Sequence, residues 1–140
     1  MNHALAPVAA YVLGGSALAA VESRIVPQRK PRSPIAPPAA AFGIAWSLLF
    51  TGLGIARARL DAPRRHRVDR LWLLCATYPL YTLGNHSRVL SYVGNALVAA
   101  TAARTAADAA RRDDTAALLI GAIVPWAAYA TLILMTERRR

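Results

Sequence analysis

Few side chains in this 140-residue sequence have the types and spacing that catalysis or metal binding requires. The three histidines, His3, His66 and His86, are far apart, and no two are placed four residues apart as on a metal-binding helix face. Cys75 is the single cysteine, so an internal disulfide is excluded. The sequence has no Ser–His–Asp set, no glycine-rich phosphate loop and no pair of carboxylates within an apolar stretch. It therefore predicts no metal site, no required cofactor and no enzyme.

Aromatic side chains at helical spacing are the stronger candidates for a binding function. Phe42, Trp46 and Phe50 are four residues apart, which places their rings on one face of a helix. Trp126 and Tyr129 are three residues apart in the last apolar stretch of the sequence. Such rings can stack on a flat apolar ligand, but they also form the packed core of many membrane helices. The sequence leaves both interpretations open.

Glu22 is an acidic residue at the end of the first long apolar stretch. It could pair with Arg24 or Arg57, contact a ligand, or lie at the membrane interface as an acid at a helix end usually does. These alternatives stay open from sequence alone.

Five uncharged stretches must supply the elements that carry these residues. Hydrophobic residues make up 56% of the chain and charged residues 17%, against about 25% in ordinary soluble domains. A helix that crosses the hydrocarbon core needs about 20 apolar residues, and backbone in lipid must be hydrogen-bonded internally. We therefore predict an all-α membrane protein, a single domain with five transmembrane helices over residues 4–23, 37–57, 69–86, 88–108 and 114–136.

The net charge of +10 raises two alternatives, a nucleic-acid-binding protein and a soluble bundle. The basic residues flank the apolar spans, where arginine favours lipid headgroups, and do not cover a soluble face. A soluble bundle would show a polar stripe at 3.6-residue spacing, and residues 41–56 and 115–135 show none. We expect the lipid bilayer, and not a nucleic acid, as the partner. The basic residues divide almost evenly between the two sets of loops, so they do not decide the orientation.

Small and capping residues add detail to the expected bundle. Gly15 and Ala99 belong to rows of small residues at spacing of four, which predicts close helix packing, and Gly54 permits another close contact. Asp113 or Asp114 is a suitable N-cap for the last helix.

The approach to the second stretch carries a motif of characteristic spacing. It reads Lys30-Pro31, Pro37-Pro38, Phe42, Trp46, Leu49-Phe50 and Gly54. This pattern resembles the signature of the TspO family of translocator proteins (TspO/MBR, tryptophan-rich sensory proteins). The last stretch, with Trp126 and Tyr129-Ala130-Thr131, is similar to the W-x-x-F-A-T-x-L pattern of the family's last helix. Pro79-Leu80-Tyr81 and Gly84 resemble the family's Pro-Leu-Phe-Phe-Gly.

The resemblance implies a five-helix receptor or carrier with a cavity between its helices for a flat hydrophobic ligand. The first class of ligand that the resemblance implies is a tetrapyrrole such as protoporphyrin or haem, and the second is a sterol-like molecule. The loop 24–35 would act as a lid, with Arg29 and Lys30 meeting the propionates of a porphyrin. The family also implies a homodimer, and we expect a multi-pass protein of a bacterial plasma membrane. The cavity residues would be Phe42, Trp46, Tyr78, Trp126, Tyr129 and Ala130.

Departures from the family pattern support two other hypotheses. The family's Asn and Trp in the third helix are Leu74 and Thr77 here, and an acidic residue usual in the fourth helix is replaced around Gly94 and Asn95. A membrane scaffold or accessory subunit that keeps the fold without binding the ligand is therefore the alternative. Porphyrin breakdown, attributed to the tryptophans of some family members, is a third hypothesis.

Overall fold

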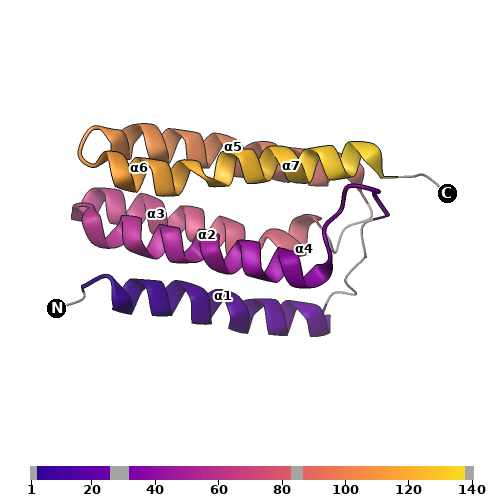
Figure 1. Cartoon of the computed structure of the whole chain (residues 1–140), viewed down its shortest axis with the longest axis horizontal. Coiled ribbons are helices and arrows are strands. Elements are labelled where there is room, and N and C mark those ends of the chain that lie inside the picture. The colour runs from indigo at the N-terminus through magenta and orange to yellow at the C-terminus, as the bar shows by residue number, and fades with distance from the viewer. Residues whose placement is uncertain (1–2, 26–31, 83–86, 138–140) are drawn as a thin grey trace.

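The computed structural model describes residues 3–25, 32–82 and 87–137, which form a bundle of side-by-side helices (Figure 1). The helices are α1 (Leu5–Ile25), α2 (Ala39–Arg59), α3 (Ala62–Ala76), α4 (Tyr78–Thr82), α5 (Arg88–Ala110), α6 (Asp114–Gly121) and α7 (Ile123–Thr136). α2 packs against α1, α3 and α6, while α5 packs against α3, α6 and α7. The described residues contain no strand, which confirms the all-α class.

The number of helices differs from the five predicted. α6 and α7 run end to end and together form the apolar span Asp114–Thr136, so the described residues contain six helices when this pair is counted once. The sixth arises because the predicted span 69–86 is divided at Thr77 into α3 and α4. Pro79 explains the division, since it has no N–H for the carbonyl of Cys75 and its ring would clash with that carbonyl in a continuous helix.

Two boundaries show how proline shapes the other elements. α3 begins at Ala62, several residues before the predicted start, and Pro63 lies in its first turn, where a missing N–H costs nothing. Pro125 lacks the N–H that would bond the carbonyl of Gly121, and α6 gives way to α7 at Ala122. Pro38 lies just outside α2 as its N-cap residue, not in the first turn as predicted.

Three helices in the described residues are long and apolar enough to cross a membrane. They are Leu5–Ile25, Ala39–Arg59 and Asp114–Thr136, which correspond to the first, second and fifth predicted spans. α5 has 23 residues, but Arg88, Arg104 and Asp108 lower its apolar character. α3 has 15 residues, and charged residues occupy its first half. Length and apolar composition thus support three of the five predicted membrane spans.

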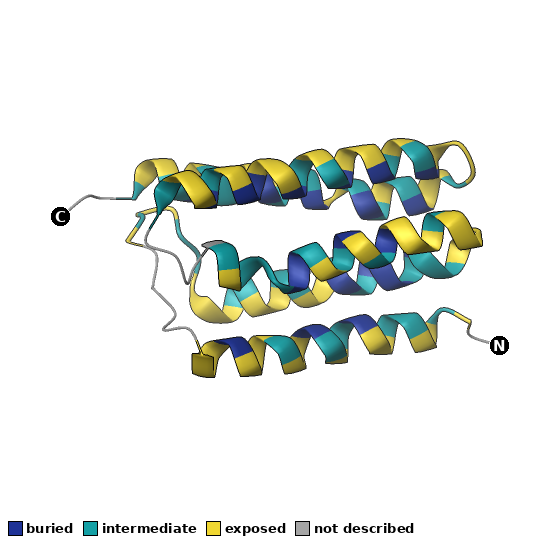
Figure 2. Ribbon diagram, turned by 180° about the vertical axis from the view of Figure 1, so that it is seen from behind, coloured by how far each residue is buried: buried dark blue, intermediate teal, exposed yellow. Residues whose placement is uncertain are grey.

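Buried side chains gather on the inward faces of the helices, as Figure 2 shows. Leu53 and Ile120 are fully buried, whereas Leu48 is 67% and Leu118 76% exposed. An outer surface covered by such apolar side chains is unfavourable in water. The exposure of these leucines therefore suits contact with lipid.

Close contact between α1 and α2 depends on two glycines. A Cβ atom on Gly54 would lie 2.6 Å from the Cα of Val8, and one on Gly15 would lie 2.3 Å from the Phe50 ring. These distances confirm the predicted close packing at Gly15 and Gly54. Ala99 packs against the core as predicted, while its neighbours Ala96 and Ala100 are exposed.

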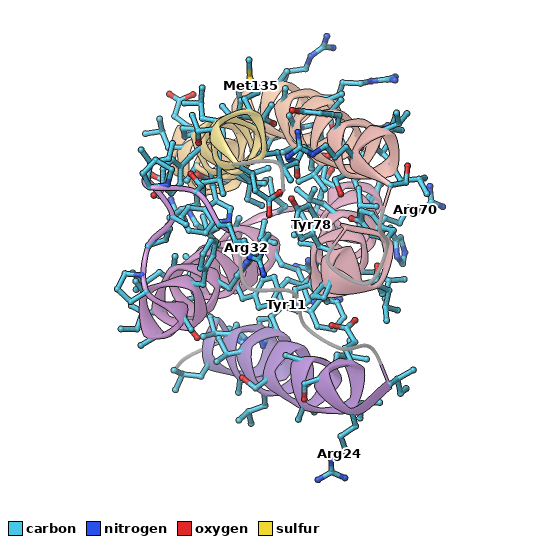
Figure 3. The ribbon with its side chains drawn as sticks, turned by 90° about the vertical axis from the view of Figure 1, so that its right-hand side faces the viewer. Tyr11, Arg24, Arg32, Arg70, Tyr78 and Met135 are labelled. Carbon is cyan, nitrogen blue, oxygen red and sulfur yellow. The ribbon has the colours of Figure 1, made fainter. Side chains whose placement is uncertain are left out.

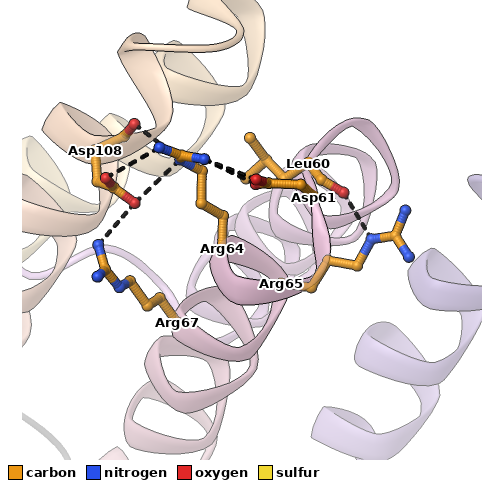
Figure 4. A network of polar contacts seen from close by, with 6 residues as sticks. All are labelled: Leu60, Asp61, Arg64, Arg65, Arg67 and Asp108. Carbon is orange, nitrogen blue, oxygen red and sulfur yellow. Dashed lines mark hydrogen bonds and ion pairs between the residues drawn. The ribbon is translucent and has the colours of Figure 1, made fainter.

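Ion pairs join the helices at the end of the bundle where α3 begins and α5 ends (Figure 4). Arg64 bonds Asp61 at 2.8 Å and Asp108 at 3.2 Å, and Arg67 bonds Asp108 at 2.7 Å. The Arg64 guanidinium holds the pKa of the Asp61 carboxyl below its usual range. Asp113 is the N-cap of α6, as predicted, and its Oδ1 accepts a 2.8 Å bond from the backbone N–H of Ala116.

Candidate functional site

An aromatic network runs through the interior of the bundle and is built mainly on one face of α2. Because Phe42, Trp46 and Phe50 recur every four residues, their rings lie in one row along that helix. The Trp46 and Phe50 ring centroids are 5.6 Å apart, and Phe50 is 7% exposed. Phe42 and Trp46 are half-buried. This row therefore faces the interior of the bundle rather than the lipid.

α7 adds two rings to the network. The Trp126 indole lies 5.7 Å from the Phe42 ring and 6.1 Å from the Trp46 ring, both in edge-on geometry. Tyr129, one turn further along α7, lies 5.7 Å from Trp126. Edge-on contacts at these centroid distances are favourable for aromatic pairs. Trp126 thus joins the row on α2 to the C-terminal helix.

Tyr78 reaches the network from α4 and also enters a buried polar chain. Its ring lies 5.8 Å from that of Trp46, and its hydroxyl is hydrogen-bonded to Oδ1 of Asn95. The Asn95 side chain, 1% exposed, donates from Nδ2 to the Thr131 hydroxyl at 3.2 Å. Thr131 in turn donates to the carbonyl of Ala127 at 2.9 Å. The chain links α4, α5 and α7, and it satisfies polar groups that would be costly if left unpaired inside the bundle.

The network continues to the opposite end of α2 through Trp72. Trp72 lies 6.1 Å from Phe50 and stacks on Tyr11 at 5.1 Å, and its Nε1–H donates to the Tyr11 carbonyl. The Tyr11 hydroxyl is hydrogen-bonded to Asp69, whose carboxylate also pairs with Arg57 at 2.7 Å. This cluster holds α1, α2 and α3 together. Figure 3 shows Tyr11 and Tyr78 between the helices, in contrast to Arg24 and Arg70, which point outward.

An open apolar pocket of about 520 Å³ lies beside the network on the outer face of the bundle, between α2 and the α6–α7 span, and exposed residues such as Leu48 form part of its lining. Small residues open it, because Ala45, Gly52 and Ala122 take little space on its walls. Trp126 and Tyr129 line it as well, so these two residues belong both to the network and to the pocket. The remaining lining residues are Leu48, Leu49, Leu119 and Pro125.

The segment before α2 is fastened across the C-terminal end of α7. The Tyr129 hydroxyl donates to the carbonyl of Ile35 at 2.5 Å, and the hydroxyls of Ser33 and Thr136 are 2.7 Å apart. Figure 1 shows this segment rising from the start of α2 to the end of α7. The described part of the predicted lid, from residue 32 onward, therefore contacts the helix that carries Trp126 and Tyr129.

The structure brings five of the predicted site residues into one network, namely Phe42, Trp46, Tyr78, Trp126 and Tyr129. Ala130 is half-buried on α7 beside Tyr129. Arg29 and Lys30, the predicted contacts for ligand propionates, lie outside the described residues.

Sequence reasoning missed three members of this site. Asn95 and Thr131 form the buried polar chain, and Trp72 extends the aromatic network to α1. An amide in an apolar helix is a signal in itself, because a polar group within a membrane span requires a partner. No sequence pattern indicated Trp72, because its ring partners, Tyr11 and Phe50, lie on two other helices.

Glu22 lies on α1 and is 2% exposed. Among the described residues, neither of its carboxylate oxygens has a hydrogen-bond partner. Of the alternatives left open by the sequence, the pairing with Arg24 or Arg57 is therefore not formed, and Arg57 is engaged by Asp69 instead.

Comparison with known proteins gives one family match. The model of the family described as TspO/MBR matches residues 3–137, which is nearly the whole chain. No curated protein and no solved structure matches the chain.

Proposed function

Because this chain belongs to the TspO/MBR family, whose members are embedded in membranes, we propose that it is a receptor or carrier for a flat hydrophobic ligand. A tetrapyrrole such as protoporphyrin or haem is the first ligand class and a sterol-like molecule the second. The protein would act as a multi-pass protein in a bacterial plasma membrane, and it would need no resident cofactor.

One observation carries this proposal. Trp126 and Tyr129 line an apolar pocket of about 520 Å³ that opens on the outer face of the bundle, so a flat apolar ligand would enter it from the lipid. A flat ligand there would place one face against the Trp126 indole, which also contacts the rings of Phe42, Trp46 and Tyr129. The network would then hold the indole in a fixed orientation, so little side-chain freedom would be lost on binding.

The polar end of such a ligand would lie near the lid. The Tyr129 hydroxyl ties the pocket wall to Ile35, and the lid segment continues to the exposed Arg32. Porphyrin propionates near Arg32 would form charge-assisted hydrogen bonds with its guanidinium group. The family resemblance assigns the same role to Arg29 and Lys30, which lie outside the described residues.

A titration of the detergent-purified protein with protoporphyrin tests the proposal. Binding is followed by the shift of the porphyrin absorption band, so that tryptophan variants are measured on the same scale. Trp126→Ala should weaken binding roughly tenfold or more, because it removes both the stacking contact and a large buried surface. Ala130→Phe and Ala45→Phe should block binding by filling space beside the indole and in the pocket.

Matched controls separate the pocket from general effects. Leu118→Ala truncates a lipid-facing side chain on the same span, and Ala128→Phe adds a ring at an exposed position of α7. Both should bind as wild type does. Absence of saturable binding to the wild-type protein, or unchanged binding by Ala130→Phe and Ala45→Phe together, would rule out the proposed site.

The scaffold hypothesis has its own supporting observation. The aromatic rings contact one another and the Tyr78–Asn95–Thr131 chain is internally satisfied, which is the arrangement of a packing core. If protoporphyrin does not bind while Trp126→Ala still lowers the melting temperature, the network serves the fold and the protein is better described as a scaffold. Turnover of porphyrin during the titration would instead favour the breakdown hypothesis.

A further inference from the structure

A second hollow, the basic groove, lies between α3 and α5, and its arginines have no part in the proposed ligand site. It has a volume of about 580 Å³, and we define it by Arg67, Arg70, Arg104, Ala107, Asp108 and Arg111. It lies at the end of the bundle where α3 begins and α5 ends. The segment 32–38 that fastens to α7 is at the other end (Figure 1).

Helical spacing brings these cations to one place. Arg67 and Arg70 are three residues apart on α3, and Arg104 on α5 is seven residues before Arg111, the C-cap residue of that helix, so each pair shares one side. Ala107 lies between Arg104 and Arg111, and its methyl group leaves the space between them open. Two helices therefore present four guanidinium groups around one hollow.

The acid within the groove is already engaged. Asp108 bonds Arg67 at 2.7 Å and Arg64 at 3.2 Å, as Figure 4 shows. Arg70, Arg104 and Arg111 form no ion pair within the described part of the chain. Like charges gathered in this way repel one another, and an anion placed among them would relieve that repulsion.

The depth of the groove in the membrane indicates which anion is available. Arg104 lies six residues before the last residue of α5, which is roughly 9 Å along a helix axis. A long arginine side chain at that depth extends toward the headgroup layer while its methylene groups stay in apolar surroundings. Arg70 is exposed and points away from the bundle in Figure 3. In a bilayer that covers the three apolar spans, these cations at the end of the bundle would lie near the lipid phosphates.

We propose that the basic groove binds the phosphate of an anionic lipid headgroup. Arg70 on α3, Arg104 on α5 and Arg111 at the C-cap of α5 donate charge-assisted hydrogen bonds to the phosphate oxygens. The bound lipid therefore bridges two helices that are less apolar than their neighbours. A free inorganic phosphate has the same chemistry, and the two sources differ in the acyl chains, which only the lipid carries.

Native mass spectrometry of the purified protein tests this assignment. The protein is incubated in detergent with equal amounts of phosphatidylglycerol and phosphatidylcholine, and the retained lipids are counted. Wild type should retain the anionic lipid preferentially. Arg104→Gln should lower that retention roughly fivefold, as expected for the loss of one arginine near an anionic surface. Arg70→Gln, an exposed position on α3, should have the same effect and does not depend on how α5 tolerates the change.

Arg112→Gln is the matched control, because it removes the same charge at the same end from an exposed position outside the groove. It should retain the lipid as wild type does. Equal retention by Arg104→Gln, Arg70→Gln and Arg112→Gln, or no preference of wild type for the anionic lipid, would overturn the proposal. Displacement of the lipid by excess inorganic phosphate, with equal thermal stabilisation by phosphate alone, would reassign the groove to a free anion.

Discussion

At Gly54 the backbones of α1 and α2 approach so closely that a methyl group has no room. A Cβ atom there would lie 2.6 Å from the Cα and 2.8 Å from the amide nitrogen of Val8. Gly54→Ala should therefore force the two helices apart and destabilise the protein by about 1–3 kcal/mol, the usual cost of overpacking. The measurement is the melting temperature in detergent.

Gly43 on the same helix provides the control, because a Cβ atom there would meet nothing within 4 Å. Gly43→Ala should leave stability unchanged or raise it by up to about 1 kcal/mol, since alanine favours helix more than glycine does. Equal melting temperatures of Gly54→Ala and Gly43→Ala would show that α1 and α2 are not in close contact at Val8.

Single residues also mark where sequence reasoning was sufficient and where it stopped. The row of Phe42, Trp46 and Phe50 could be predicted because spacing along one helix fixes a shared face. The pairing of Asn95 with Tyr78 and Thr131 could not, since it depends on how three separate helices are rotated toward one another. The spacing of residues within one helix does not indicate how that helix is rotated relative to its neighbours.

The start of α6 depends on the charge of Asp113. Its carboxylate accepts the backbone N–H of Ala116 and pairs with Arg59 at 2.8 Å, and the backbone bond is the main cause of its lowered pKa. A group whose pKa is lower in the folded state stabilises the fold above its unfolded pKa, about 4, and this stability is lost as pH falls through the folded pKa. Asp113→Asn should therefore melt a few degrees below wild type at neutral pH, and the difference should shrink below about pH 4.

Asp114→Asn is the matched comparison, because Asp114 is exposed and forms no ion pair with a described residue. It should melt close to wild type at every pH. A gap between Asp113→Asn and wild type that persists unchanged in acid would show that the charge of Asp113 does not stabilise the fold.

The division between α3 and α4 shows why an uncharged stretch is not the same as a helix. The sequence predicts one span over 69–86 because residues 71–87 carry no charge, but Pro79 removes a hydrogen bond within it and separates two helices. Hydropathy indicates whether a segment favours water or lipid, whereas backbone hydrogen bonding determines where a helix ends. The position of Tyr78 at the start of α4, and hence its access to Trp46, follows from that break.

The outer face of α5 suggests how two molecules would assemble. Ala96, Ala100 and Ala103 are exposed and lie on one side of the helix, where small side chains allow backbones to approach closely. We propose that the homodimer expected from the family forms through this face. Ala100→Phe should shift the protein from dimer to monomer in light scattering of the detergent-purified sample. Ala10→Phe, at an exposed position of α1, should remain dimeric, and a dimeric Ala100→Phe would place the interface elsewhere.

The contrast between three strongly apolar helices and two weaker ones bears on how the chain enters the bilayer during synthesis. α1 and α2 emerge from the ribosome first, and each is apolar enough to partition into lipid by itself. α3 and α5 carry arginines, and their transfer into lipid alone would be costly, so they must wait for a partner surface. The α1–α2 hairpin and the α6–α7 span supply such surfaces on either side of them. We therefore expect insertion to be cooperative, with α3 packing on the α1–α2 hairpin and α5 entering the bilayer only together with the later α6–α7 span.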